Sequence, residues 1–144
     1  MFSKACEYAI RSTVYIASKS IKNERGTLID IAEEIDSPIA FTAKILQQLV
    51  KSKVIHSIKG PHGGFFIPQD ELRTTSLIQV VVAIDGNKLF TGCGLGLKKC
   101  NKNHPCPVHH QFAGIRNDLE AMLRNTTMHA MAEGVDSGLA FLKT

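Results

Sequence analysis

Three cysteines and three histidines gather in one short stretch of this chain, GCGLGLKKCNKNHPCPVHH, over residues 92–110. Glycines and prolines lie between and just beyond the cysteines, and they predict a loop rather than a helix or strand. A soft metal centre needs such a loop, because the backbone must curl to bring thiolates to one point and leave N–H groups facing sulfur. The residues that could bind a metal there are Cys93, Cys100, Cys106, His104, His109 and His110.

The composition fits a folded protein of the cytoplasm. With 44% hydrophobic and 21% charged residues in 144, the chain predicts one domain, or a compact head with an appended dimerisation element, rather than disorder. No apolar run approaches the roughly 20 residues that span a bilayer, and the first residues lack the features of a secretory signal. Cysteines in the reducing cytoplasm more often bind metals or react than form disulfides. The net charge of +4, with nine Lys/Arg against six Asp/Glu in residues 1–67, is compatible with a phosphate-facing surface.

The first predicted element is an amphipathic helix over residues 3–21, with Ser3 as its N-cap. Cys6 lies on its apolar stripe, so we expect a small buried hydrophobic residue there rather than a ligand. Glu7 and Arg11 are four residues apart, and this spacing predicts a surface ion pair worth roughly a few tenths of a kcal/mol.

Two short helices separated by a tight turn follow. Thr27 to Asp30 is typical of a capping box that opens the first helix. Ser37 and Pro38 are expected to open the second helix, as its N-cap and its first helical residue. The pair is typical of a helix-turn-helix, although an ordinary amphipathic pair would show the same pattern. The outer face of the second helix is small, polar and basic: Ala40, Ala43, Lys44, Gln47 and Lys51.

A hairpin signal comes directly afterwards. Two β-rich runs, 54–59 and 65–67, are joined by the glycine-rich segment 60–64. A helix-turn-helix followed at once by such a hairpin is typical of a winged helix, whose recognition helix enters the major groove while the wing reaches the neighbouring minor groove or backbone. The DNA-binding residues that this predicts are Ala40, Ala43, Lys44, Gln47, Lys59, Pro61, His62 and Gly63.

Further helices are expected on both sides of the cysteine loop. Residues 75–85 predict a helix that ends at Gly86, although their β-branched run also fits a strand. Pro107 is expected to start a long helix that breaks at residues 125–127, before a final helix ending at Gly134. The seam of the long helix favours pairing with a second copy, because little chain remains to cover it. Its members are Val108, Phe112, Ile115, Leu119 and Met122.

These elements predict a mainly α fold with a small β-hairpin wing: a winged helix-turn-helix joined to a long dimerisation helix. We expect a DNA-binding domain over residues 1–90, the cysteine loop over 91–107, the dimerisation helix and a short C-terminal helix over 107–134, and a tail over 135–144. No nucleophile–base pair or phosphate loop is recognisable, so an enzyme is not expected.

This order of parts resembles the IscR/NsrR-type winged-helix regulators of the Rrf-two superfamily. The likeness covers roughly residues 1–134, and its most specific parts are the wing sequence IKGPHGGFF, residues 58–66, and the three-cysteine loop. It implies a homodimeric bacterial transcription regulator that carries an iron–sulfur cluster, [2Fe–2S] or [4Fe–4S], in each subunit and binds a near-palindromic operator according to cluster state. The chain departs from the family where the first cysteine gap has six residues instead of five, and where Lys59 replaces the usual Arg.

The resemblance places the cluster cysteines at Cys93, Cys100 and Cys106, and it offers two fourth ligands. His109 follows Cys106 at the spacing of the family's own histidine ligand, and Glu7 lies where other members supply a carboxylate from the partner subunit. We choose His109, because its tether to Cys106 is short while Glu7 depends on how the dimer packs. Either ligand leaves one weak corner on the cluster, as a sensor requires.

Two other interpretations of the cysteines stay open. One is a structural zinc site of the Cys₃His type, although the close cysteine pairs of zinc ribbons are absent. The other is a regulator of the same fold without metal, whose thiols are redox-sensitive and which responds to a partner protein or metabolite.

Overall fold

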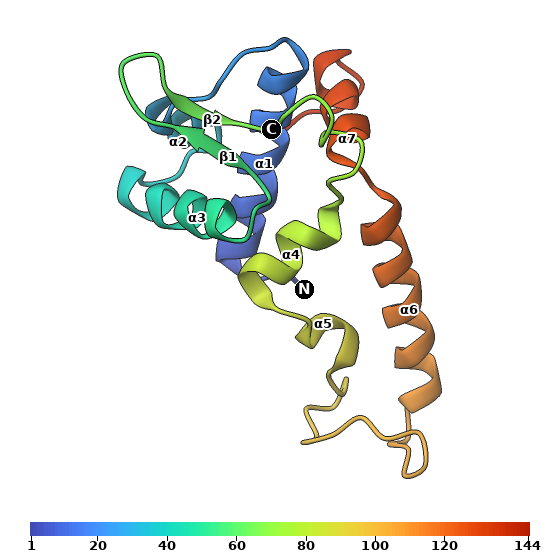
Figure 1. Cartoon of the computed structure of the whole chain (residues 1–144). Helices are drawn as coiled ribbons and strands as arrows, with labels where there is room; N and C mark the ends of the chain where they lie inside the picture. Colours follow the sequence, from blue (N-terminus) through green and yellow to red (C-terminus); the bar gives the residue numbers. More distant parts are fainter.

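A computed structural model describes residues 1–144, and its helices and hairpin confirm the predicted mainly α fold. A compact head contains the hairpin and most of the helices, while α6 runs away along one side and the chain between α5 and α6 lies at the end opposite the hairpin (Figure 1). The elements are α1 (Lys4–Ile21), α2 (Leu28–Glu34), α3 (Ile39–Lys51), β1 (His56–Ile58), β2 (Gly64–Phe66), α4 (Leu77–Asp85), α5 (Lys88–Thr91), α6 (His109–Asn125) and α7 (Met128–Asp136).

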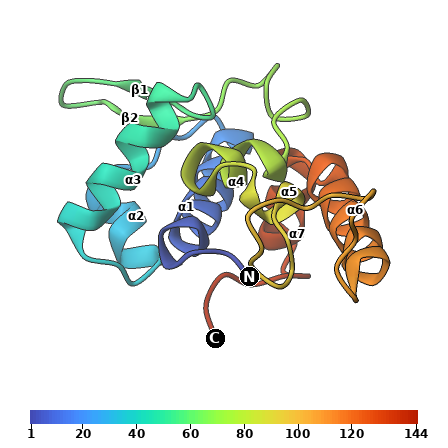
Figure 2. The ribbon, with the colours of Figure 1, turned by 90° about the horizontal axis from the view of Figure 1, so that it is seen from below.

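Helix α1 forms the centre of the head. It lies between α3 on one side and α7 on the other, with α4 packed across it (Figure 2). The predicted N-cap is confirmed, since the Ser3 hydroxyl accepts a hydrogen bond from the Cys6 amide at 3.0 Å. Cys6 is fully buried, as its place on the apolar stripe predicted, because the stripe recurs at helical spacing and faces the neighbouring helices.

The predicted Glu7–Arg11 ion pair is wrong. Glu7 pairs instead with Lys4, at 3.7 Å. Arg11 lies with its guanidinium carbon 4.7 Å from the centre of the Tyr8 ring, and its Nη1 atom donates to the Ile35 carbonyl at 3.3 Å. The carbonyls at the C-terminal end of α2 lack hydrogen-bond partners within their own helix. The Ile35 carbonyl therefore accepts a hydrogen bond from the Arg11 guanidinium in place of the Glu7 carboxylate.

The helix-turn-helix is α2 followed by α3. The capping box is confirmed, because the Asp30 amide donates to Thr27 Oγ1 at 3.1 Å and the Thr27 amide donates to Asp30 Oδ2 at 3.4 Å. The predicted start of α3 is wrong by one residue. Pro38 has an extended ψ of 136° and is the N-cap itself, while the Ser37 hydroxyl is buried without a hydrogen-bond partner.

The hairpin that forms the wing is short and is fixed at its base. His56 pairs with Phe66 and Ile58 with Gly64, while Gly26 adds one more bridge to Phe65 from the turn before α2. A Cβ atom at Gly63 would lie 2.1 Å from the Ile58 carbonyl oxygen, so no side chain fits at that position. Gly63 is therefore required by how closely the two arms of the wing approach, whereas Gly60 is favoured by its φ of 107°.

The helices after the wing lie near their predicted places. The helix expected over 75–85 is confirmed as α4, which ends where Gly86 adopts a φ of 71°. Helix α6 begins at His109, two residues after the predicted start at Pro107, because Val108 with φ −118° still lies in the preceding turn. Helix α7 runs to Asp136, beyond the predicted end at Gly134. None of the helices is both long and apolar enough to cross a lipid bilayer.

Candidate functional site

The predicted DNA-facing residues lie on two adjoining surfaces of the head. On α3, the side chains of Ala40, Lys44 and Gln47 are exposed and Ala43 is half-buried. Between α3 and the hairpin lies a groove of about 340 Å³. It is lined by Gln47, Val50, Ser57, Ile58, Lys59, Gly64 and Phe65. Lys59, Pro61 and His62 are exposed at the wing tip, and Gly63 is half-buried.

Arg25 contacts the wing in a way that the sequence alone did not predict. Its Nη1 atom donates to the His62 carbonyl at 2.8 Å, and its guanidinium carbon lies 5.5 Å from the centre of the Phe66 ring. Arg25 and His62 are 37 positions apart, so no local sequence pattern predicts this hydrogen bond. The neighbouring Gly26 also pairs with the hairpin. Arg25 therefore braces the wing and places a second cation beside it.

Gln48, beside Gln47 on α3, connects this helix to α4. Its Nε2 atom donates to the Ala83 carbonyl in the last turn of α4, at 2.8 Å. Two residues farther on, Asp85 accepts a hydrogen bond from the Ser3 amide at 2.9 Å. The C-terminal end of α4 is thus bonded both to the recognition helix and to the start of α1.

The cysteine loop, residues 92–108, connects α5 to α6. His109, the first residue of α6, is buried, and its Nδ1 atom lies 3.4 Å from Sγ of Cys100. The same sulfur accepts a hydrogen bond from Arg116 Nη2 at 3.2 Å. Cys100, His109 and Arg116 therefore form one cluster on the side of α6.

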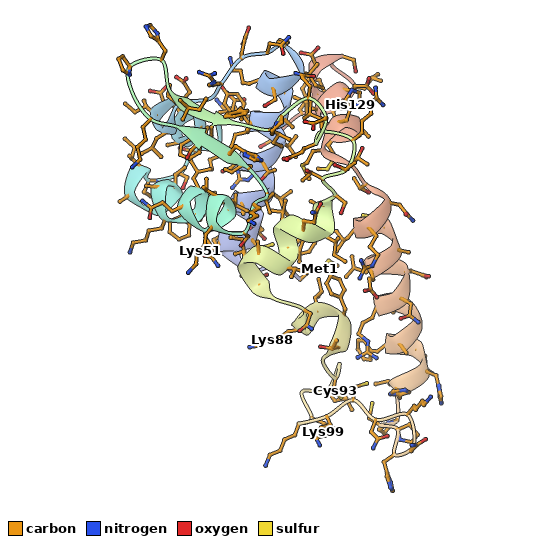
Figure 3. All side chains as sticks on the ribbon, viewed as in Figure 1. Met1, Lys51, Lys88, Cys93, Lys99 and His129 are labelled. Atoms are coloured by element: carbon orange, nitrogen blue, oxygen red, sulfur yellow. The ribbon has the colours of Figure 1, made fainter.

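Cys93 lies at the start of the loop (Figure 3). Its Sγ atom accepts a hydrogen bond from the Leu95 amide at 3.4 Å. Backbone hydrogen bonds from Leu95 and Leu97 lower the pKa of the Cys93 thiol, with further lowering by the Cys106 side chain and by the charge of Arg116. The first and third cysteines are thus neighbours, and the thiolate form of Cys93 is stabilised.

The predicted ligands come together in two pairs rather than in one group. Cys93 neighbours Cys106, and Cys100 contacts His109, but no group of three or more His, Cys, Asp or Glu side chains is positioned to hold a metal ion. The predicted alternative ligand, Glu7, is exposed on α1 and pairs with Lys4. The remaining histidines, His104 and His110, are both exposed.

Residues 2–134 match the Rrf2 family, which is described as an iron-dependent transcriptional regulator. The chain belongs to the Rrf2 family. It is 28% identical over 131 residues to an HTH-type transcriptional regulator of Aquifex aeolicus, which covers 89% of this chain and 88% of that protein.

Solved structures of low sequence identity share the fold of this Rrf2-family chain. CymR of B. subtilis, the global cysteine regulator, superposes with a TM-score of 0.76 at 16% identity, covering 94% of this chain and 98% of CymR. IscR of T. potens superposes with a TM-score of 0.75 at 16% identity, covering 97% and 91% of the two chains. The winged helix-turn-helix and the long helix α6 are therefore shared with both proteins.

The predicted seam of this Rrf2-family chain lies along α6. Phe112, Ile115 and Met122 are exposed, and Ile115 most of all, at 63% of its surface. Leu119 is half-buried and packs against the core, and Val108 is half-buried. A single copy of the chain thus leaves most of the seam facing solvent.

Charge is unevenly distributed along the chain. Residues 86–117 contain five basic residues and no acidic one, whereas the other residues contain twelve basic and thirteen acidic ones and carry a net charge of −1. The side chains of Lys88 and Lys99 extend away from the body of the protein (Figure 3). A net charge of +5 therefore surrounds the cysteine loop, where it would favour the thiolate form of the cysteines.

Proposed function

We propose that this chain is a homodimeric DNA-binding transcription regulator whose operator affinity depends on an iron–sulfur cluster held by Cys93, Cys100, Cys106 and His109. The cluster is [2Fe–2S] or [4Fe–4S], with [2Fe–2S] our first expectation. Glu7 of the second subunit is the alternative fourth ligand. When bound, such a cluster supplies a redox-active, destructible group at the end of the molecule opposite the wing.

The contact between His109 and Cys100 is the observation that carries this proposal. A buried imidazole 3.4 Å from a thiol places nitrogen and sulfur donors side by side. The donor set fits a soft metal group, since three thiols on the loop and one imidazole at the start of α6 lie near spare N–H groups. One of those, Arg116 Nε, is buried without any hydrogen-bond partner.

DNA binding is assigned to α3 and the wing. Ala40 and Ala43 let the helix approach the major groove, where Gln47 can bond an adenine edge. Lys44 and Lys59 contact phosphates, with Lys59 on the wing beside Pro61, His62 and Gly63. The groove between α3 and the wing supports this assignment, because Gln47 and Lys59 are exposed and line it from its two sides.

Anaerobic purification tests the cluster. We expect a brown protein with visible absorbance, with iron and sulfide in equal amounts, and with different operator affinities before and after chelation of the iron. Cys100→Ala should abolish the colour, while Cys6→Ala, which changes a buried core thiol, should keep it. A colourless protein with one zinc per chain would replace the proposal with a structural zinc site.

A second candidate is a regulator of the same fold that holds no metal. It is favoured by the separation of the ligands into two pairs and by the fold shared with CymR, which is named for cysteine rather than for a metal. In that case, wild-type protein and the Cys100→Ala variant would bind the operator equally well, and neither would contain iron or zinc.

A further inference from the structure

Arg116 contacts both ends of the first cysteine gap from its position on α6. Its Nη1 atom donates to the carbonyl oxygen of Gly92, the residue before Cys93. Its Nη2 atom donates to Sγ of Cys100 at 3.2 Å. The remaining N–H group, at Nε, is buried and has no hydrogen-bond partner. Because a buried unpaired donor is costly, this group points to an acceptor that the protein alone does not supply.

We propose that Arg116 is a positioning residue for the cysteine loop. Its guanidinium holds the loop against α6 before any cluster is present, and its free Nε–H group then donates to a sulfur atom of the bound cluster. The first part depends on contacts within the chain alone, and the second part rests on the function proposed above.

The placement of Arg116 on α6 supports this role. It follows His109 by seven residues, which is two helical turns, so both side chains project from the same face and meet at Cys100. Arginine normally pairs with a carboxylate, but no acidic residue occurs in residues 86–117, and Arg116 forms no salt bridge. The guanidinium is therefore directed at sulfur and backbone rather than at a carboxylate.

The chemistry of the guanidinium fits a sulfur partner. It remains charged at every relevant pH, and its planar fork bonds two acceptors at once while a third donor stays free. N–H groups and positive charge beside an iron–sulfur cluster stabilise its more negative, reduced form and raise its reduction potential. Arg116 would thus set the potential of the cluster as well as the shape of the loop.

A metal-free experiment tests the first part. Wild-type protein, Arg116→Gln and Arg116→Lys are treated with a chelator and a reductant, then digested with a protease that cuts only after lysine. The loop offers Lys98, Lys99 and Lys102, and only cuts after these three residues, identified by mass, are compared, because Arg116→Lys adds a site of its own. Both variants should be cut at least roughly tenfold faster, the factor expected when only one of the two hydrogen bonds from the guanidinium is lost. The control Arg124→Gln removes a charge on the same helix that pairs with Glu120, and it should match wild type.

The second part is tested after reconstitution with iron and sulfide. The midpoint potential should fall in Arg116→Gln, and it should lie between that value and wild type in Arg116→Lys, which keeps the charge but not the fork. Far-UV circular dichroism checks the fold, and the lysine variant tests the fork even where the glutamine variant does not fold.

Each part has its own contrary result. Equal cutting rates in wild type and in both Arg116 variants would overturn the positioning role. A faster-cut loop with an unchanged potential and visible spectrum would overturn donation to the cluster. A wild-type chain that takes up no cluster would overturn the second part together with the function proposed above, while the digestion would still decide the first part.

Discussion

The Nδ1 atom of His109 lies 3.4 Å from Sγ of Cys100, although nine positions separate the two residues in the chain. One side chain begins α6 and the other belongs to the loop that precedes it. A nitrogen donor and a sulfur donor are thus in contact before any metal is bound. Because His109 is already in contact with a proposed cysteine ligand, substituting His109 tests whether it is the fourth ligand of the cluster.

His109→Ala should weaken the cluster, while Glu7→Ala should not. Removing the imidazole takes away one ligand, so we expect a shifted visible spectrum and cluster loss roughly tenfold faster under a chelator. His110→Ala is the matched control, because that neighbouring ring is exposed. If only the Glu7 variant shows these changes, the fourth ligand is the carboxylate of the second subunit.

Lys59→Ala should weaken operator binding at every sequence tested. One lost phosphate contact reduces the slope of log affinity against log salt by about 1. Lys88→Ala removes the same charge from α5, at the other end of the molecule, and should leave the slope nearly unchanged (Figure 3). A wild-type slope for Lys59→Ala, measured by fluorescence anisotropy across a salt series, would remove the wing tip from the DNA interface.

Ile115→Lys should convert the dimer into monomers. Its side chain is 63% exposed in a single chain, so the substitution leaves the core of the subunit intact and places a charge in the interface. Leu119 is less suitable, because it also packs against the core. Asn117→Lys adds the same charge to an exposed position off the seam and should remain dimeric. Sedimentation velocity measures both, and a dimeric Ile115→Lys would place the interface elsewhere.

Cys6→Ala should flatten the loss of stability at alkaline pH. Burial, followed by the charge and hydrogen bond of Asp85, raises the pKa of the Cys6 thiol from 9.0 to about 12. The unfolded thiol therefore ionises above pH 9 while the folded one stays neutral, and the free energy of unfolding falls as pH rises from 9 toward 12. Urea unfolding of the alanine variant should show a smaller decline over this range than wild type or Cys106→Ala. Parallel declines in all three proteins would contradict it.

Local signals in the sequence were enough for most of the fold. The apolar stripe around Cys6, the capping box at Thr27 and the close glycines of the wing each act within a few residues, and each is found where predicted. Proline was a less certain guide, because Pro38 and Pro107 lie just ahead of helices that begin one or two residues later. A proline fixes φ but not ψ, so it does not decide whether it belongs to the helix.

The sequence predicted which residue types form the candidate site, but it did not predict which of them are in contact. The sequence shows which thiols and imidazoles are available, whereas the partners of Arg25 and Arg116 lie 37, 24 and 16 residues away. Such contacts arise from tertiary packing, and the hydrophobic periodicity of the sequence does not predict them. The separation of the ligands into two pairs likewise depends on how the loop folds over α6.

Helix α4 lies between the recognition helix α3 and the cysteine loop, and hydrogen bonds at its C-terminal end connect it to α3 and to Ser3. The helix has nine residues and is thus about 13 Å long, and its last turn holds the 2.8 Å hydrogen bond from Gln48 and the 2.9 Å hydrogen bond from Ser3. Gly86 and α5 then lead directly to Cys93. A displacement of about 1 Å along the axis of a hydrogen bond is enough to break it. A shift of that size at the end of α4 would therefore break the Gln48 hydrogen bond, while the buried side chains of α3 and α4 would still hold the two helices together.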